Sequence, residues 1–202
     1  NEKGFKKASF VLKGTNFVFD KTLAVTLGPQ IEQLYTNLGP TGQFDFYYPT
    51  INVSIKDNDE KQIELVGQTV FKQCSFGLNR TIANFNATLS GKALYNSSIG
   101  VDSAQLHLNA ESLEIKDRYV TGLNADINYN AKTNSVAADN VAAACFGGSL
   151  AGFGKIQDFL SDNNTRYEIQ LGFDEIDAHK FILLDDDQPG YDNGKLGGSL
   201  TV

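Results

Sequence analysis

The sequence predicts a mainly β fold: a long, curved antiparallel sheet that forms an open groove or an incomplete barrel and carries two short helices. Three observations lead to this fold class. Apolar and polar residues alternate with a period of two over most of the chain, which is typical of strands that bury one face and expose the other. Clusters of Asn, Asp, Ser and Gly separate these runs, as turns do. Helical periodicity is confined to two short stretches.

The alternating runs extend along the whole chain. The N-terminal third contains "ASFVLKG", "NFVFD" and "FDFYYPTINVSIK", and later runs are "IANFNATLSG", "AQLHLNA", "GLNADINYN" and "RYEIQLGF". Together they predict about ten or eleven strands in a meander. The residues expected on one continuous apolar face are Phe85, Leu89, Leu106, Leu108, Leu123, Ile127, Ile169 and Leu171.

Two stretches carry helix signals. In "GPQIEQLYTNLGPTG", Pro29 suits the first turn of a helix, and Gly39 followed by Pro40 is a stop signal. In "DEIDAHKFILLDDD" we expect a second short helix over roughly 176–184, with Asp177 as its N-cap.

The glycine-rich stretch "CFGGSLAGFGKI" is superficially similar to a phosphate-binding loop. Its sequence does not match the first or the last position of the Walker motif. No helix or parallel unit follows it, as a dinucleotide site would require. Glycine within a strand instead permits a bulge, a sharp bend or close approach of another backbone. We therefore interpret the stretch as a strand in which Gly152 and Gly154 leave side chains missing from one face.

Composition excludes several classes of function. The net charge of −7 and the absence of a basic stripe argue against a nucleic-acid partner. The two histidines and two cysteines are scattered, so we expect no metal site and no cofactor. Cys74 and Cys145 both lie in apolar strand-like runs, and two free buried thiols are favoured over a single disulfide.

The sequence predicts no enzyme and no catalytic residues. No G-x-S-x-G motif is present, and neither cysteine has a basic neighbour that would activate it. The acidic run 185–187 is interpreted as a solvated turn, and it lacks the ligand spacing of an EF-hand calcium site. An enzyme that uses this acidic loop ranks third among the hypotheses.

The stretch "AAACFGGSLAGFGKI…YEIQLGFDEIDAHKFIL" resembles a signature of AsmA-like (AsmA/TamB-type) envelope proteins. The matching residues are the aromatic Phe146, the pair Gly147 and Gly148, the later Gly152, and Asp177 at the start of a helix. The stretch "TLGPQIEQLYTNLGPTGQFDF" is similar to the helix-and-turn step that opens a neighbouring repeat in such proteins. The resemblance gives these motif residues a structural role.

The resemblance implies a non-enzymatic segment that forms a hydrophobic β-groove for lipid passage or outer-membrane biogenesis. The eight apolar residues named above would then face lipid, although such residues also form ordinary protein cores. Expected partners are phospholipid or fatty-acyl chains and neighbouring repeats of a larger parent protein. The expected location is the periplasm or cell envelope, with anchoring to the membrane through a segment absent from this chain.

No linker divides the chain, so we expect one β-rich domain over 1–202. "FGGSLAG" at 146–152 recurs as "LGGSLTV" at 196–202, which is typical of a repetitive β-protein. Because the chain also lacks methionine, we expect a segment of a larger protein, with the next repeat beginning near residue 190. The alternative function is a β-rich structural or protein-interaction module of the envelope, binding through sheet edges, with edge-strand self-association among its outcomes.

Overall fold

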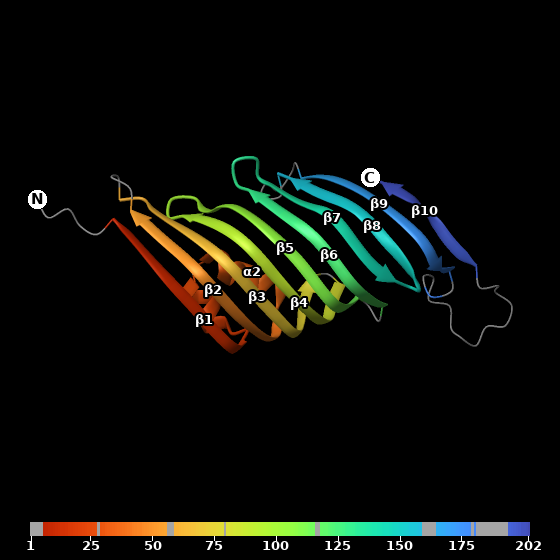
Figure 1. Cartoon of the computed structure of the whole chain (residues 1–202), viewed down its shortest axis with the longest axis horizontal. Helices are drawn as coiled ribbons and strands as arrows, with labels where there is room; N and C mark the ends of the chain where they lie inside the picture. The colour runs from red at the N-terminus through yellow and green to blue at the C-terminus, as the bar shows by residue number, and fades with distance from the viewer. Residues whose placement is uncertain are drawn as a thin grey trace, which may run out of the picture.

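The computed structural model describes residues 6–27, 29–55, 59–78, 80–115, 118–158, 165–178, 180 and 194–202. Within them, ten strands form one antiparallel sheet in the order in which they occur in the sequence (Figure 1). The sheet is not closed, and the predicted fold class is confirmed. The strands are β1 (Lys7–Val18), β2 (Thr41–Ile55), β3 (Lys61–Leu78), β4 (Arg80–Asn96), β5 (Gly100–Ile115), β6 (Arg118–Asn130), β7 (Ser135–Cys145), β8 (Gly148–Gln157), β9 (Arg166–Asp177) and β10 (Lys195–Thr201).

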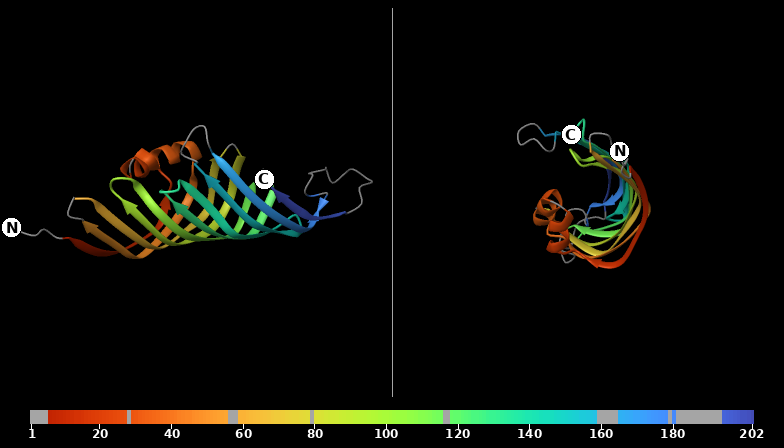
Figure 2. Two further views of the ribbon diagram at one scale, coloured as in Figure 1. Left: turned by 90° about the horizontal axis from the view of Figure 1, so that it is seen from above. Right: turned by 90° about the vertical axis from the view of Figure 1, so that its left-hand side faces the viewer.

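The sheet curls into a trough. Seen along its length, it has the outline of an open C, and helices α1 (Lys21–Leu27) and α2 (Pro29–Leu38) lie on the concave side near β1–β3 (Figure 2). The Phe19 ring, just before α1, contacts the rings of Phe44 on β2 and Phe71 on β3, with centroids 4.8 and 6.4 Å apart. The helices therefore cover one end of the concave face only.

The two helical regions differ from the prediction in part. Helix α2 occupies the predicted stretch and is confirmed. Helix α1 was not predicted, because its Thr and Val residues favour strands; it begins where the Thr22 N–H donates to the Asp20 carboxylate at 2.5 Å. At the second predicted helix, β9 continues to Asp177, whose Oδ1 accepts a hydrogen bond from the Lys180 N–H at 3.3 Å, as an N-cap does. The rest of that helix lies outside the described residues.

β-Bulges explain why the sheet curls. Asn16, Gln73 and Asn140 have φ values of 56°, 49° and 52°, and each lies at a register shift between neighbouring strands. Two bulged N–H groups are satisfied by side chains: Asn16 donates to Asp45 Oδ1 at 2.7 Å, and Gln73 donates to Asn86 Oδ1 at 2.9 Å. A bulge bends its strand and increases the local twist, so several of them coil the sheet.

The glycine-rich stretch is a hairpin turn followed by strand β8; the sequence predicted the strand but not the turn. Phe146 and Gly147 form the two-residue loop, both with positive φ, as hairpin turns require. A side chain at Gly152 would place its Cβ only 2.0 Å from the Gln170 carbonyl oxygen, whereas a Cβ at Gly154 meets no atom within 4 Å. Close backbone approach thus requires glycine at 152, and Gly154 leaves open space.

The single layer has a small core. Ala87, Ala110 and Leu113 are buried together, and the larger apolar residues around them are only partly buried. Both cysteines are buried and free, which confirms the favoured prediction over a disulfide. Burial raises the pKa of both thiols, so they are protonated at neutral pH.

Candidate functional site

The candidate site is the concave face of the sheet, here called the groove. Cross-strand pairing arranges its side chains in rows that cross the strands. One row passes from Leu106 on β5 through Ile127 and Ala138 to Gly154 and Ile169 on β9. Nine strand spacings of about 4.8 Å separate β1 from β10 by about 43 Å, measured across the strands.

All eight predicted groove residues lie on this concave face, and every one is half-buried. Leu89 pairs with Leu108, and Ile169 and Leu171 pair with Gly154 and Gly152. The structure therefore brings together on one surface residues that lie 86 positions apart in the sequence. Half-burial shows that this surface is neither a sealed core nor fully solvated.

Aromatic rings fill the groove at the β1–β4 end. The Phe71 ring lies 5.5 Å from Phe85 and 6.5 Å from Phe76, and Phe17 lies 5.0 Å from Phe46. Of this group, only Phe85 was predicted to face the groove. The signal for the others was present in "FDFYY" and "TVFKQCSF", where phenylalanines recur at groove-facing positions.

Small side chains line the groove at the β7–β10 end. Gly152 and Gly154 occur there beside Ala138, and the apolar residues Leu171 and Phe173 on β9 project into the same space. At the final strand, Leu200 is 52% exposed. This part of the groove has no helix over it among the described residues (Figure 2).

Several of the motif residues meet at one junction between the β7–β8 turn and the end of β9. The Phe146 carbonyl oxygen accepts a hydrogen bond from the Asp177 N–H at 2.9 Å, so the hairpin turn is tied to the end of β9. The Arg118 guanidinium lies over the Phe146 ring, 5.9 Å from its centroid. Gly148 lies against the Asp174 carbonyl oxygen, where an added Cβ would be 2.3 Å away.

The convex face is polar. Lys72 forms an ion pair with Asp45 at 2.5 Å, and Lys92 forms another with Glu64. These lysines donate hydrogen bonds that lower the pKa of each carboxyl group, and Asn16 and Asn52 lower them further. This face therefore remains charged and hydrated while the groove is apolar.

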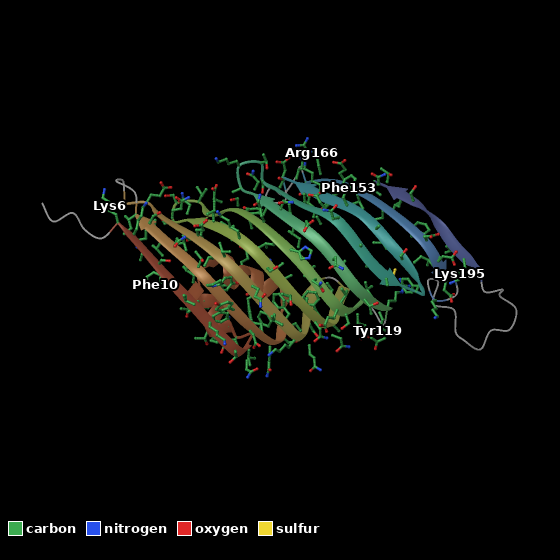
Figure 3. All side chains as sticks on the ribbon, viewed as in Figure 1. Lys6, Phe10, Tyr119, Phe153, Arg166 and Lys195 are labelled. Atoms are coloured by element: carbon green, nitrogen blue, oxygen red, sulfur yellow. The ribbon has the colours of Figure 1, made fainter. Side chains whose placement is uncertain are left out.

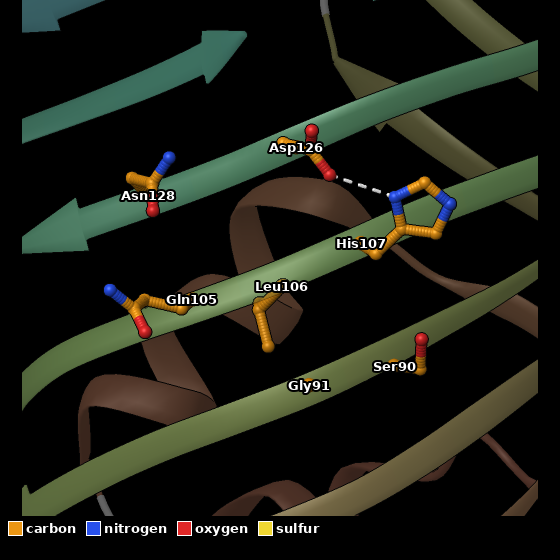
Figure 4. Close-up of a pocket in the computed structure, with 7 residues that line it drawn as sticks. All are labelled: Ser90, Gly91, Gln105, Leu106, His107, Asp126 and Asn128. Atoms are coloured by element: carbon orange, nitrogen blue, oxygen red, sulfur yellow. Dashed lines mark hydrogen bonds and ion pairs between the residues drawn. The ribbon is translucent and has the colours of Figure 1, made fainter. Parts of the chain in front are cut away.

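A shallow hollow of about 340 Å³ lies on the convex face over Gly91 (Figure 4). Ser90, His107 and Asp126 are successive cross-strand partners on β4, β5 and β6 at this position. His107 Nδ1 lies 2.8 Å from Asp126 Oδ1, and Asn140 donates to the other carboxylate oxygen at 2.7 Å. The hydrogen bonds from Asn140 and His107 lower the pKa of Asp126.

This Ser–His–Asp row does not form a proton relay in the structure. No hydrogen bond joins Ser90 to His107, and the His107 and Asp126 side chains are 52% and 44% exposed. Water therefore reaches the pair freely, and the row is typical of a polar ladder on a solvated sheet face. Among the described residues, no group of three or more acidic, histidine or cysteine side chains is arranged to hold a metal. The acidic run 185–187 lies outside the described residues.

Comparisons with protein-family models, with curated proteins and with solved structures find no match for this chain. Among the described residues, no helix is long and apolar enough to cross a bilayer.

Proposed function

We propose that the groove holds the acyl chains of phospholipids or fatty acids, and that the chain is a non-enzymatic segment of an AsmA-like envelope protein. In this role it contributes to lipid passage or outer-membrane biogenesis from the periplasm or cell envelope. One observation carries the proposal. The groove face of β4–β9 is apolar, its large predicted groove residues are only half-buried, and no second layer covers it in the described part of the chain.

The energetics favour an acyl chain that lies along the trough. Each buried methylene contributes about 0.8 kcal/mol, and the rows of apolar side chains continue across neighbouring strands, which gives an acyl chain a continuous apolar surface. Gly154 leaves open space on the groove floor, where a methylene chain would approach the backbone. The polar convex face keeps the sheet in water while the acyl chain covers its apolar side.

The resemblance to AsmA-like proteins supports the same proposal through its motif. The Phe146–Gly147 turn and the N-cap at Asp177 are joined by a backbone hydrogen bond. The motif residues thus act as a unit, which is what a repeated structural signature needs. The proposal treats their role as shaping the groove, without contact to lipid.

A charge placed in the groove tests the proposal, with a matched control on the opposite face of the same strand. Ile169 faces the groove and is half-buried, whereas its neighbour Gln170 is exposed on the convex face. For the Ile169→Glu variant we expect binding of a fluorescent fatty acid to weaken by about tenfold or more, because the carboxylate loses hydration beside the acyl chain. The Gln170→Glu variant should bind within about twofold of the unaltered chain.

A second variant fills the groove without adding charge. Gly154→Leu inserts a side chain where the structure has open space, so the sheet should retain its circular dichroism spectrum while acyl binding falls. Native mass spectrometry of the purified unaltered chain should detect bound phospholipid or fatty acid. Two results together would contradict the proposal. The purified chain would carry no lipid, and all three variants would bind the fluorescent fatty acid with the same affinity.

The second candidate is a structural or protein-interaction module. Within the described part of the chain, the outer edges of β1 and β10 pair with no further strand, which favours this candidate, since strand edges recruit other strands. The groove variants distinguish the two candidates. An edge-binding module would bind its partner equally well after Ile169→Glu, whereas a lipid-binding groove would not.

A further inference from the structure

Three tyrosines face the groove at one rim of the trough, here called the tyrosine rim. Each lies one residue inside the end of its strand, and they are Tyr95 on β4, Tyr129 on β6 and Tyr167 on β9. Tyr129 and Tyr167 lie two residues from the groove residues Ile127 and Ile169, and side chains two apart on a strand share a face. Tyr95 lies six residues from Leu89, in a stretch of β4 whose pairing with β3 has no register shift.

The opposite rim, here called the packed rim, is built differently. Leu113, Cys145 and Ile176 lie at or near the other ends of β5, β7 and β9, and all three are buried. Tyr95 and Tyr167 are exposed. Apolar surface is therefore covered by protein at the packed rim and accessible from outside at the tyrosine rim.

Two hydroxyl groups at the tyrosine rim are available to a ligand. Those of Tyr95 and Tyr167 form no hydrogen bond with any of the residues that the structure describes. At the β1–β4 end of the groove, by contrast, the Tyr48 hydroxyl lies 2.8 Å from the Thr69 hydroxyl. A tyrosine hydroxyl can donate one hydrogen bond and also accept one.

The charged groups near the two rims also differ. Arg166, next to Tyr167, forms an ion pair with Asp158 at 2.7 Å, so this cation already has a partner. At the packed rim, the Arg118 guanidinium lies over the Phe146 ring, and its Nε is buried without a hydrogen-bond partner among the described residues. Recognition at the tyrosine rim therefore relies on hydroxyl groups, whereas a charged headgroup at Arg118 would have to lose its hydration.

We infer that the tyrosine rim binds the carbonyl end of an acyl lipid, while the hydrocarbon tail lies in the groove. This inference rests on the proposed function and adds an orientation to it. A tyrosine has an apolar ring and a polar tip, which suits it to a boundary between an apolar surface and water. The ester or carboxyl oxygen of an acyl lipid accepts a hydrogen bond from the hydroxyl, while the first methylenes of the tail contact the ring.

Removal of the two hydroxyl groups tests the inference. The double variant Tyr95→Phe with Tyr167→Phe should bind monooleoylglycerol about fivefold more weakly, because it loses two neutral hydrogen bonds that water partly replaces. Its affinity for diphenylhexatriene, a hydrocarbon probe without an acceptor, should stay within about twofold. Oleic acid distinguishes the two sources of the carbonyl: weakening for both lipids assigns any acyl carbonyl, and weakening for oleic acid alone assigns the free carboxyl group.

Tyr119→Phe is the matched control. Tyr119 is 64% exposed and Tyr167 is 60% exposed. Tyr119 lies on the convex side, because its neighbour Val120 packs against the buried core. Figure 3 shows Tyr119 and Arg166, which precedes Tyr167, at opposite ends of the strands. The control should leave all three affinities unchanged.

Two outcomes separate this inference from the proposed function. If the unaltered chain and the double variant bind both lipids equally well, the tyrosine rim is overturned and acyl binding in the groove stands. If the unaltered chain binds none of the three ligands, the inference and the proposed function are both overturned.

Tryptophan probes on β9 test the direction of the bound lipid. The sequence has no tryptophan, so Tyr167→Trp and Phe173→Trp introduce single probes about 20 Å apart along the strand. A fatty acid with a nitroxide near its carboxyl end should quench the probe at 167 more strongly. With the nitroxide near its methyl end, it should quench the probe at 173 more strongly. The reverse order would place the polar end towards the packed rim and Arg118, and it would overturn the inference.

Discussion

The two ends of the groove use the same alternating pattern in different ways. At the β1–β4 end, phenylalanine rings and the two helices occupy the concave face. At the β7–β10 end, glycine and alanine alternate with aliphatic residues and the face stays open. Curvature created by bulges leaves a concavity along the whole sheet, and side-chain volume decides where the protein fills it. The filled end therefore provides most of the ring packing, and the open end provides the surface that we propose to hold acyl chains.

The largest expected effect is loss of a ring from the filled end. Phe71→Ala removes contacts with Phe19, Phe76 and Phe85 and should cost about 3 kcal/mol of unfolding free energy. Leu171→Ala at the open end should cost only about 1 kcal/mol, because that side chain has fewer neighbours to lose. Urea denaturation followed by circular dichroism measures both. Equal losses of unfolding free energy in the two variants would contradict the conclusion that the β1–β4 end is the more tightly packed one.

Two glycines on the groove face of β8, Gly152 and Gly154, test where the open end has free space. Gly152→Ala should destabilise the chain by about 2 kcal/mol, since the new Cβ would lie 2.0 Å from the Gln170 carbonyl oxygen. Gly154→Ala, with no atom within 4 Å of its Cβ, should change stability by less than about 0.5 kcal/mol. Thermal unfolding of the pair of variants checks this. A larger loss at Gly154 would mean that the floor of the groove is already occupied.

Tryptophan reporters locate the bound acyl chain. The chain contains no tryptophan, so Phe173→Trp and Phe71→Trp each introduce a single probe on the groove face. Phospholipid with brominated acyl chains should quench the probe at 173 strongly and the probe at 71 weakly, because rings and helices cover the latter. Stronger quenching at position 71 than at position 173 would contradict the proposal that the acyl chain binds at the β7–β10 end.

The smallest expected effect concerns pH. Asp45, Glu64 and Asp126 have pKa values below those of an unfolded chain, mainly because Lys72, Lys92 and Asn140 donate hydrogen bonds to them. A lowered native pKa contributes stability above the unfolded pKa, and that stability is lost as the pH falls through the native value.

Unfolding free energy should therefore decline slightly below about pH 4, and the decline should be smaller in the Asp45→Asn variant. Urea midpoints measured between neutral and acidic pH test this. Two of the three carboxylates lie on β2 and β3, so acid should loosen the filled end first. An unchanged acid slope in the variant would exclude the Asp45 contact as a cause.

Much of the fold could be predicted from local pattern. Period-two alternation placed Leu106, Leu108 and Ile127 on one face, and that face is the concave one. The helix at α2 followed from Pro29 at its start and Gly39 at its end. Helix α1 could not be predicted, because its β-branched residues favour strands and its formation depends on the Asp20 cap and on packing against α2.

The sequence by itself determined which residues alternate, where most turns fall and why "CFGGSLAGFGKI" forms a strand and not a phosphate loop. These features depend on steric preferences within a few residues. Only the tertiary structure decided that the apolar faces form rows along an open trough, that phenylalanines and helices close one end, and that Ser90, His107 and Asp126 become neighbours. Strand order, register and the phase of each bulge arise from hydrogen bonds between distant segments, and local sequence carries no direct record of them.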